Sequence, residues 1–478
     1  MQLSDFIAIQ RRRRFLQRTA CGLGTVALSQ LLAGESTAAP GTKPLAPREP
    51  HFTPRAKNVI FIFMSGGPSQ YDLYLPRPEM KRLHRQPVPE SFLHNLDDVL
   101  IKGSAQVFAS PRRYTKHGEC GMDFSDYVPH LATCADELCM VRSMHTDVSN
   151  HHPAQLIMNC GVPFFGMPAM GSWVTYGLGS ELRDLPGFVV LLSNSGEGVD
   201  GGSSLWNNGF LSSEYRGVNF RSKGDPILHL NSPEGVSLRT QRSRLDAIRQ
   251  LNELRLQDTG DREIASRISS YELAYRMQLA APEFVDLSRE TAKTREMYGV
   301  DNEKTQWFGS NCLLARRMVE RGVRFVQLYH STWDDHGNLN EKLKTNCDMT
   351  DQPAAALIKD LRQRGLLDET LVIWGGEFGR TPMNEVRRGN TPGKEGREHH
   401  PFAFTMLLAG GGIQGGQIVG KTDELGYHPT EDPIHVHDLQ ATILHCLGID
   451  HEELTFRHQG RDFRLTDIGG VVVDKLLA

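Results

Sequence analysis

Residues able to bind a cation crowd into the stretch from Tyr329 to Asn338, which reads YHSTWDDHGN. The stretch follows an apolar run, residues 323–328, that has the length of a buried strand. Its carboxylate and imidazole side chains are His330, Asp334, Asp335 and His336. Carboxylate oxygen and imidazole nitrogen together suit a divalent cation of the zinc, manganese or iron kind. The alternative interpretation is a polar loop whose Asp residues cap the next helix.

A second polar turn follows the apolar run 138–144 and precedes a helical pattern that ends at Cys160. Its candidate residues are Ser149, Asn150, His151 and His152. The start of a helix offers free backbone N–H groups to an anion, and a Ser beside a metal is a plausible nucleophile. The alternative is an ordinary helix cap with exposed His side chains.

Two further groups of candidates lie nearer the C-terminus. Glu377 and Arg380 follow the apolar run 370–374, where a metal ligand and an oxyanion-binding guanidinium would be expected. The alternative is a Glu–Arg pair that pins a loop. His399 and His400 lead into the run 402–408, so one or both could return to the same site.

The elements that must position these residues are short apolar runs separated by helical patterns. The runs cover residues 57–64, 138–144, 185–192, 323–328, 370–374 and 402–408. Such an order predicts an α/β fold, a three-layer α/β/α sandwich with a mainly parallel sheet. Because ligands bind at the carboxyl edge of such sheets, we expect the polar groups to converge there. Asp72, in the Gly-rich turn after the first run, could be a ligand or a turn cap.

One segment differs in kind. Residues 237–300 show charged residues between apolar residues at helical spacing, which predicts a helical insertion. It could be a lid over the site or an oligomer contact.

The N-terminus predicts export. Four Arg at 11–14 precede a short apolar run, residues 20–33, and then small residues, the pattern of a signal peptide of the twin-arginine type. We therefore expect a signal peptide over residues 1–39, a linker over 40–56, one large domain over 57–478, and a periplasmic or secreted protein. A membrane anchor is the alternative, but the run is short for a span. No later segment is apolar enough to cross a bilayer.

Charge and cysteine content exclude some classes. The net charge of the 478 residues is −4, and the positive charge of residues 1–39 leaves the remainder near −7, which argues against nucleic acid as a partner. Beyond Cys21 the chain holds seven Cys without a Cys-x-x-Cys pair, so neither a zinc ribbon nor a disulfide framework is expected. Most should be buried apolar residues, with a bridge within Cys120–Cys139 as the alternative.

Several segments resemble one bacterial family. They are KNVIFIFMSGGPSQYD, SNHHPAQLIMNCG, WDDHGN, TLVIWGGEFGRTP, DLQATILHCLGID and GRDFRLTDIGG, together with the His399-His400 segment, and the resemblance extends over about residues 57–476. The resemblance is to the family called domain of unknown function 1501, within the alkaline phosphatase and sulfatase superfamily. It implies an alkaline phosphatase-like sandwich with a metal site at the carboxyl edge of the sheet. It also implies cleavage of phosphate or sulfate esters.

The resemblance assigns roles unevenly. It makes Ser149 the first candidate nucleophile, with Asn150, His151 and His152 as alternatives. It places metal ligands at Asp334, Asp335, His336 and Glu377, and at His399 or His400. The chain departs from the superfamily in having Ser65-Gly66-Gly67 where an Asp usually follows the first strand, with Asp72 several residues on. The sulfatase pattern Cys/Ser-x-Pro-x-Arg is absent.

The sequence therefore predicts an exported metal-dependent hydrolase of phosphate or sulfate esters. The expected cofactor is a divalent metal, zinc, manganese or calcium, with Ser149 or a water attacking and Arg380 steadying the anion. The substrate would be a small-molecule or polysaccharide ester. The alternative is a non-catalytic envelope protein of the same fold that binds a glycan or an anion.

Overall fold

The computed structural model describes residues 45–92, 106–193, 199–221, 236–385 and 393–478. The predicted signal peptide lies outside the described residues. Within them, residues 45–454 and 464–478 form one compact unit. Residues 455–463 belong to a second unit, in which β16 (Phe456–His458) pairs antiparallel with β17 (Arg461–Phe463).

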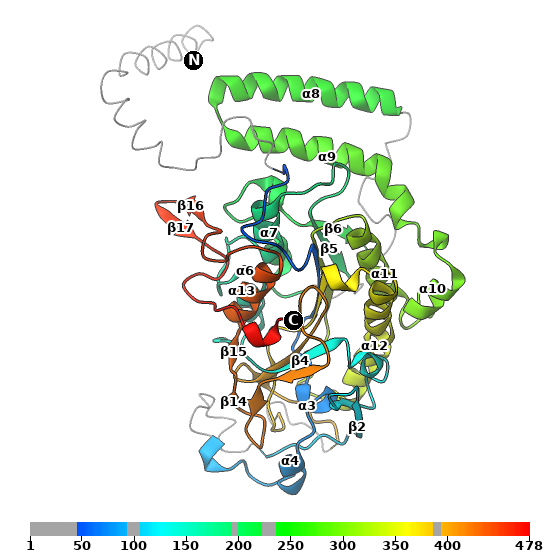
Figure 1. Ribbon diagram of the computed structural model, residues 1–478, viewed down its shortest axis with the longest axis vertical. Coiled ribbons are helices and arrows are strands. Elements are labelled where there is room, and N and C mark those ends of the chain that lie inside the picture. The colour runs from blue at the N-terminus through cyan, green and yellow to red at the C-terminus, as the bar shows by residue number, and fades with distance from the viewer. Residues whose placement is uncertain (1–44, 93–105, 194–198, 222–235, 386–392) are drawn as a thin grey trace, which may run out of the picture. The chain divides into compact units, whose positions relative to one another are not determined.

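A mainly parallel sheet forms the centre of the large unit, as predicted (Figure 1). Its strands, in spatial order, are β12 (Gln417–Val419), β4 (Leu138–His145), β11 (Phe404–Ala409), β8 (Thr370–Gly375), β1 (Asn58–Met64), β7 (Phe325–His330), β5 (Phe188–Leu192) and β6 (Val218–Arg221), with β15 (Ile434–His435) beside β4. Every residue of β1, β7 and β8 is buried, because helices cover both faces.

Strand direction explains how distant segments meet. β1 pairs parallel with β7 and β8, and β5 pairs parallel with β7. Only β11, among the described strands of this sheet, runs against its neighbours β4 and β8. The carboxyl ends of β1, β4, β7 and β8 therefore share one edge with the amino end of β11, and the segment that leads into β11 arrives there too.

Helices flank the sheet, whereas α8 (Leu238–Thr259) and α9 (Arg262–Val285) lie side by side as a pair away from its strands (Figure 1). The other helices are α3 (Gln70–Leu73), α4 (Pro78–Arg82), α6 (His151–Cys160), α7 (Met170–Leu178), α10 (Ala292–Tyr298), α11 (Gln306–Glu320), α12 (Leu339–Gln363) and α13 (Val436–Cys446). Alternate residues of β1, Ile60 and Ile62, pack into one core cluster with Leu313 of α11 and Leu357 of α12. Helix α7 contacts β5 and β7, and α13 contacts α6. Among the described helices none combines the length and the apolar character that a bilayer crossing requires.

Short two-stranded sheets border the central one. They are β2 (Tyr114–His117) with β3 (Met122–Ser125), β9 (Gly379–Arg380) with β10 (His399–His400), and β13 (Lys421–Thr422) with β14 (Pro429–Glu431). In the second of these, His399 lies opposite Arg380. This pairing fixes the entry of the His segment beside the end of β8.

Candidate metal centre

Four side chains from three distant segments gather at the carboxyl edge of the sheet. His151 begins α6, Asp334 and His336 lie in the loop after β7, and His399 lies in β10. One nitrogen or oxygen atom from each lies within 4.8 Å of the atoms from the other three. The structure thus brings together Asp334, His336 and His399, three of the residues for which the sequence predicts metal binding. It adds His151, which the sequence proposes as a catalytic residue.

The four potential ligand atoms are spaced as ligands of one ion would be. The Asp334 Oδ1 atom lies 3.3 Å from His151 Nε2, 3.0 Å from His336 Nε2 and 3.1 Å from His399 Nε2. The Nε2 atoms of His336 and His399 are 3.0 Å apart. Zinc–ligand bonds of about 2 Å at tetrahedral angles would separate ligand atoms by about 3.3 Å. The spacing therefore fits a four-coordinate cation after small shifts of side chains.

Each imidazole is held by its other nitrogen. The Nδ1 atom of His151 lies 2.7 Å from Glu377 Oε1, and that of His399 lies 2.7 Å from the carbonyl oxygen of Ser149. The Nδ1 atom of His336 lies 3.3 Å from Glu385 Oε2. An acceptor on Nδ1 fixes the proton there and leaves the Nε2 lone pair for a cation, which is how most metal-binding His residues are oriented.

The Nε2 atom of His151 tests whether the four residues suit a metal ion. Nε2 is buried and makes no hydrogen bond with any group in the described part of the chain, although it faces Asp334. A buried polar atom without a hydrogen bond is costly unless something else satisfies it. The donor set, three imidazoles and one carboxylate, is one that zinc and manganese accept. The residues present fit a divalent metal.

Close backbone packing shapes the loop that carries Asp334 and His336. A Cβ at Gly66 would lie 2.5 Å from the Asp334 nitrogen, and a Cβ at Gly396 would lie 2.1 Å from the His336 carbonyl carbon. The loop is bounded by two residues with positive φ, Thr332 at 80° and Asn338 at 57°. For a β-branched Thr that conformation is strained, and such strain is found where packing holds a functional loop in place.

Arg380 joins the loops around the site. Its Nε donates to the Gly67 carbonyl at 2.9 Å, its Nη1 to the Arg397 carbonyl at 3.0 Å, and its Nη2 to Asp334 Oδ1 at 2.6 Å. The side chain is 1% exposed. These contacts position Asp334. The prediction that Arg380 also binds a substrate anion stays a prediction.

Glu377 lies one contact outside the cluster. It is fully buried and accepts from the Gly66 N–H at 3.0 Å and from Gln155 Nε2 at 3.0 Å, besides His151. The sequence predicts Glu377 as a ligand, whereas its contact with His151 Nδ1 makes it the residue that orients His151. Gln155 has no recognisable signal in the sequence, because a single Gln in an amphipathic helix usually has no special role.

Without a metal, the pKa values of His151 and His399 shift in opposite directions. Burial lowers the pKa of His151, but Asp334 and Glu377 outweigh burial and raise the pKa to about 9. Burial lowers the pKa of His399 to about 4, despite Asp334. Burial raises the pKa of Asp334, but the three imidazoles and Arg380 outweigh it and hold the pKa well below its usual range. A protonated His151 therefore supplies positive charge where a cation would supply it.

Four other predicted residues lie outside the cluster. His330 is buried and accepts from Trp333 Nε1 at 3.0 Å, and His400 is buried with Nε2 2.7 Å from the Tyr427 carbonyl. Asp72 is buried in an ion pair with Arg397 at 2.8 Å. Asp335 is also buried, and burial raises its pKa to about 7. The side-chain contacts of His330, His400 and Asp72 are with the surrounding chain, whereas the buried Oδ1 atom of Asp335 makes no hydrogen bond within the described residues.

The predicted nucleophile lies beside the cluster. Ser149 is exposed two residues before α6, and its own carbonyl holds His399. Asn150 is the N-cap of α6 and makes no side-chain capping bond. His152 is exposed. Ser149 is therefore linked through the backbone to two of the four cluster residues.

A second group shares His336. Glu385 and Glu398 each offer a carboxylate oxygen within 4.8 Å of an atom of His336 and of each other. Glu398 Oε1 lies 3.7 Å from His336 Nδ1, and burial together with Glu385 raises the pKa of Glu398. Sequence reasoning missed both Glu residues, since neither follows a strand nor forms a recognisable spacing.

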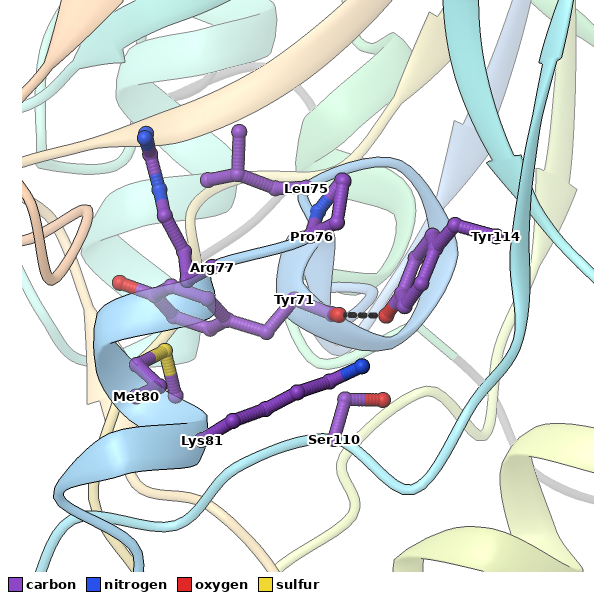
Figure 2. A pocket seen from close by; sticks show the side chains of 8 residues that line it. All are labelled: Tyr71, Leu75, Pro76, Arg77, Met80, Lys81, Ser110 and Tyr114. Carbon is purple, nitrogen blue, oxygen red and sulfur yellow. Dashed lines mark hydrogen bonds between the residues drawn. The ribbon is translucent and has the colours of Figure 1, made fainter.

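A small hollow lies elsewhere on the large unit. Figure 2 shows the side chains that line it, which come from α3, α4, the link between them, and the start of β2 with the chain before it: Tyr71, Leu75, Pro76, Arg77, Met80, Lys81, Ser110 and Tyr114. The Tyr114 hydroxyl donates to the Tyr71 carbonyl (Figure 2). None of these residues belongs to the metal cluster.

Comparison with solved structures gives distant likenesses. The PsFucS1 sulfatase from Pseudoalteromonas sp. is 12% identical with a TM-score of 0.37, over 90% of this chain and 72% of that one. The lipoteichoic acid synthase LtaP from Listeria monocytogenes is 9% identical with a TM-score of 0.35, over 88% and 78%. The alkaline phosphatase from the Antarctic bacterium TAB5 is 11% identical with a TM-score of 0.32, over 77% and 95%. At scores this low, no activity follows for this chain.

No curated protein is similar in sequence. A family model described as "Protein of unknown function (DUF1501)" matches residues 56–477, nearly the whole chain. The sequence segments that resemble this family include those that supply the four cluster residues. The chain therefore belongs to the DUF1501 family.

Proposed function

We propose that this protein is an exported, divalent-metal-dependent hydrolase of phosphate or sulfate esters. The metal would be held by His151, Asp334, His336 and His399. The family resemblance implies a phosphate or sulfate ester as the substrate. The Arg-rich pattern at the N-terminus implies export.

One observation carries the proposal. Three imidazoles, from a helix start, a loop and the short strand β10, have their Nδ1 atoms engaged by oxygen acceptors, and their Nε2 atoms face a single carboxylate. His side chains that only form hydrogen bonds within a protein can use either ring nitrogen. They need not all direct Nε2 at the same carboxylate. The buried Nε2 atom of His151, which makes no hydrogen bond within the described residues, supports a cation at the same point.

Each remaining residue of the site has a separate role in the proposed reaction. A divalent cation held there supplies Lewis-acid polarisation of an ester oxygen. The Ser149 hydroxyl, or a water, would attack the phosphorus or sulfur atom, the bond from that atom to the ester oxygen would break, and the alcohol would leave with the proton that the nucleophile loses. An ester formed on Ser149 would then be hydrolysed by water, which restores the hydroxyl. The exposed side of Asp334 would face the substrate. Arg380 would keep the Asp334 carboxylate in place, and Glu377 would keep the His151 lone pair directed inward.

A second candidate function is supported by Asp72 and Arg380. Asp72, the Asp nearest the end of β1, forms an ion pair with Arg397. The Nε and Nη1 atoms of Arg380 donate to backbone carbonyls of the chain itself. Both observations favour a non-catalytic protein of the same fold that binds a glycan or an anion and keeps the cation site.

The test is metal analysis of the purified mature protein, beside hydrolysis of aryl phosphates and aryl sulfates. We expect about one equivalent of transition metal per chain, by the four-ligand coordination of one ion, and hydrolysis of one ester class. The variants His151→Ala and His399→Ala should lose both metal and activity. His117→Ala, at the end of β2, is the control that should lose neither.

The outcomes separate the candidates. Metal without hydrolysis of either ester class would favour the binding protein. Absence of metal after growth and refolding with zinc and manganese would overturn both. Detection of the mature protein in the cytoplasm, not the periplasm or the medium, would overturn the proposed export.

A further inference from the structure

Helix α8 presents an outer face that the described part of the chain leaves open. It is 22 residues long, and none of its residues is buried. Its inner face lies along α9, where Arg242 pairs with Glu272 at 2.7 Å (Figure 1). A surface helix usually buries its apolar side chains, so exposed apolar residues on the outer face of α8 indicate a surface that a partner could cover.

The outer face carries an apolar stripe with regular spacing. Ala247, Leu251 and Leu254 recur at intervals of four and three residues, and Ile248 lies beside them. Leu251 is 67% exposed, Leu254 63% and Ile248 41%. Alternating three- and four-residue spacing is the seam of helix-on-helix packing in coiled coils. The spacing therefore fits another helix better than a flat surface.

Charged residues at the two ends of the stripe indicate that the helix that docks on it is a second copy of α8. Arg244 lies seven residues before Leu251, and Asp258 lies seven residues after it, so both continue the same seam. Both are exposed. If a second α8 lies antiparallel across the first with its Leu251 opposite Leu251, each Arg244 meets an Asp258. In the same register each Ile248 meets a Leu254.

We propose that α8 is a self-association surface on which a second copy of this chain docks antiparallel, with Leu251 on the two-fold axis. A two-fold interface must be self-complementary, since residue i meets residue j twice. Leu251 meets itself, the apolar pairs match, and the two charge pairs are opposite in sign. The small Ala247 lies opposite Arg255 in this register, which leaves room for the aliphatic stem of that Arg.

Charge reversal tests the register directly. Sedimentation velocity of the mature protein should show a reversible dimer. Arg244→Asp and Asp258→Arg should each raise the dimer Kd by about tenfold or more, because like charges then face each other twice. The double variant Arg244→Asp/Asp258→Arg should dimerise again. An equal mixture of the two single variants should form a heterodimer, because each Asp then meets an Arg.

Controls keep the test specific. Arg239→Asp, on α8 but off the stripe, should leave the dimer Kd unchanged, and Leu251→Glu should give a monomer with the same circular dichroism. A mature protein that is monomeric at all concentrations would overturn the proposal. So would a dimer whose Kd does not respond to Leu251→Glu, which would place the interface elsewhere. Binding of the α8 face to lipid vesicles in place of a second copy would also overturn it.

Discussion

The side chain of Glu377 shows how a residue without a direct place in the cluster can control it. Its carboxylate accepts from His151 Nδ1 at 2.7 Å and is itself held by Gly66 N–H and Gln155. The carboxylate thereby fixes the proton on Nδ1 and aims Nε2 at Asp334. Such outer contacts set the affinity of a metal ligand without touching the metal.

We predict that Glu377→Gln lowers metal affinity by about 10- to 100-fold, the usual cost of removing an outer carboxylate from a metal-binding His. Competition with a chelator of known affinity measures it, with Glu453→Gln, an exposed residue, as the control. The far-ultraviolet circular dichroism should not change, since Gln has the same shape. Unchanged affinity in Glu377→Gln would show that the His151 orientation does not depend on this carboxylate.

His330 is a residue-scale probe of acid stability. Burial lowers its pKa to about 3, against an ordinary value of 6.5. Between these two pH values the unfolded chain binds a proton that the folded chain does not, so stability is lost as the pH falls below 6.5. The slope for one such group approaches about 1.4 kcal/mol per pH unit.

We predict that the unfolding free energy of the natural protein falls more steeply between pH 6.5 and pH 5 than that of His330→Asn. Asn removes the titrating group and keeps an acceptor for the Trp333 indole N–H. Urea unfolding at both pH values gives the comparison, and the difference in slope should be about 1 kcal/mol per pH unit. Equal slopes would mean that His330 does not titrate on unfolding.

At the scale of elements, the apolar runs predicted β1, β4, β5, β7, β8 and β11 because nearly all residues of these strands are buried. The edge strands β6 and β12 are partly exposed and were not predicted. The predicted run 57–64 is β1 (Asn58–Met64), and 370–374 is β8 (Thr370–Gly375). Which of His399 and His400 reaches the site could not be read from the sequence. Neighbours in a strand point to opposite faces, and only the pairing of β10 with β9 decides which face meets Asp334.

Gly66 connects the first strand to the loop of Asp334. Its φ is +117°, and a Cβ there would lie 2.5 Å from the Asp334 nitrogen. We predict that Gly66→Ala destabilises the protein by about 2–4 kcal/mol, from backbone strain plus displacement of the loop, and weakens metal binding. Gly166→Ala is the matched control, with φ +98° and nothing within 4 Å of its Cβ.

Thermal unfolding and chelator competition on both Gly variants separate two effects. One is the backbone strain at positive φ, and the other is the close approach of a Cβ at position 66 to Asp334. The control should lose about 1 kcal/mol from positive φ alone and should keep its metal affinity. Equal losses in the two variants would show that the approach of Gly66 to Asp334 has no energetic role.

At the scale of the whole molecule, strand direction explains only part of the convergence. The carboxyl ends of parallel strands share an edge, which brings the loop of Asp334 and His336 beside the end of β8. His399 reaches the same edge because β11, the strand that follows it, runs antiparallel to β4 and β8, a direction that the sequence did not predict. The sequence did not indicate that His151 would join them as a ligand. The helix-start pattern predicts its position, but only the tertiary contact with Glu377 shows which nitrogen faces inward.

The cluster also predicts that metal and fold are coupled across the molecule. Its residues lie at 151, 334–336 and 399, so the unfolded chain cannot hold them together, and a metal binds the folded state alone. At a free metal concentration 100 times Kd, we expect about 2.7 kcal/mol of added stability. Guanidinium unfolding with and without zinc or manganese measures it, and the double variant His151→Ala/His399→Ala should show no gain. An equal gain in that variant would place the stabilising metal outside the cluster, and no gain in either protein would show that the four side chains hold no ion.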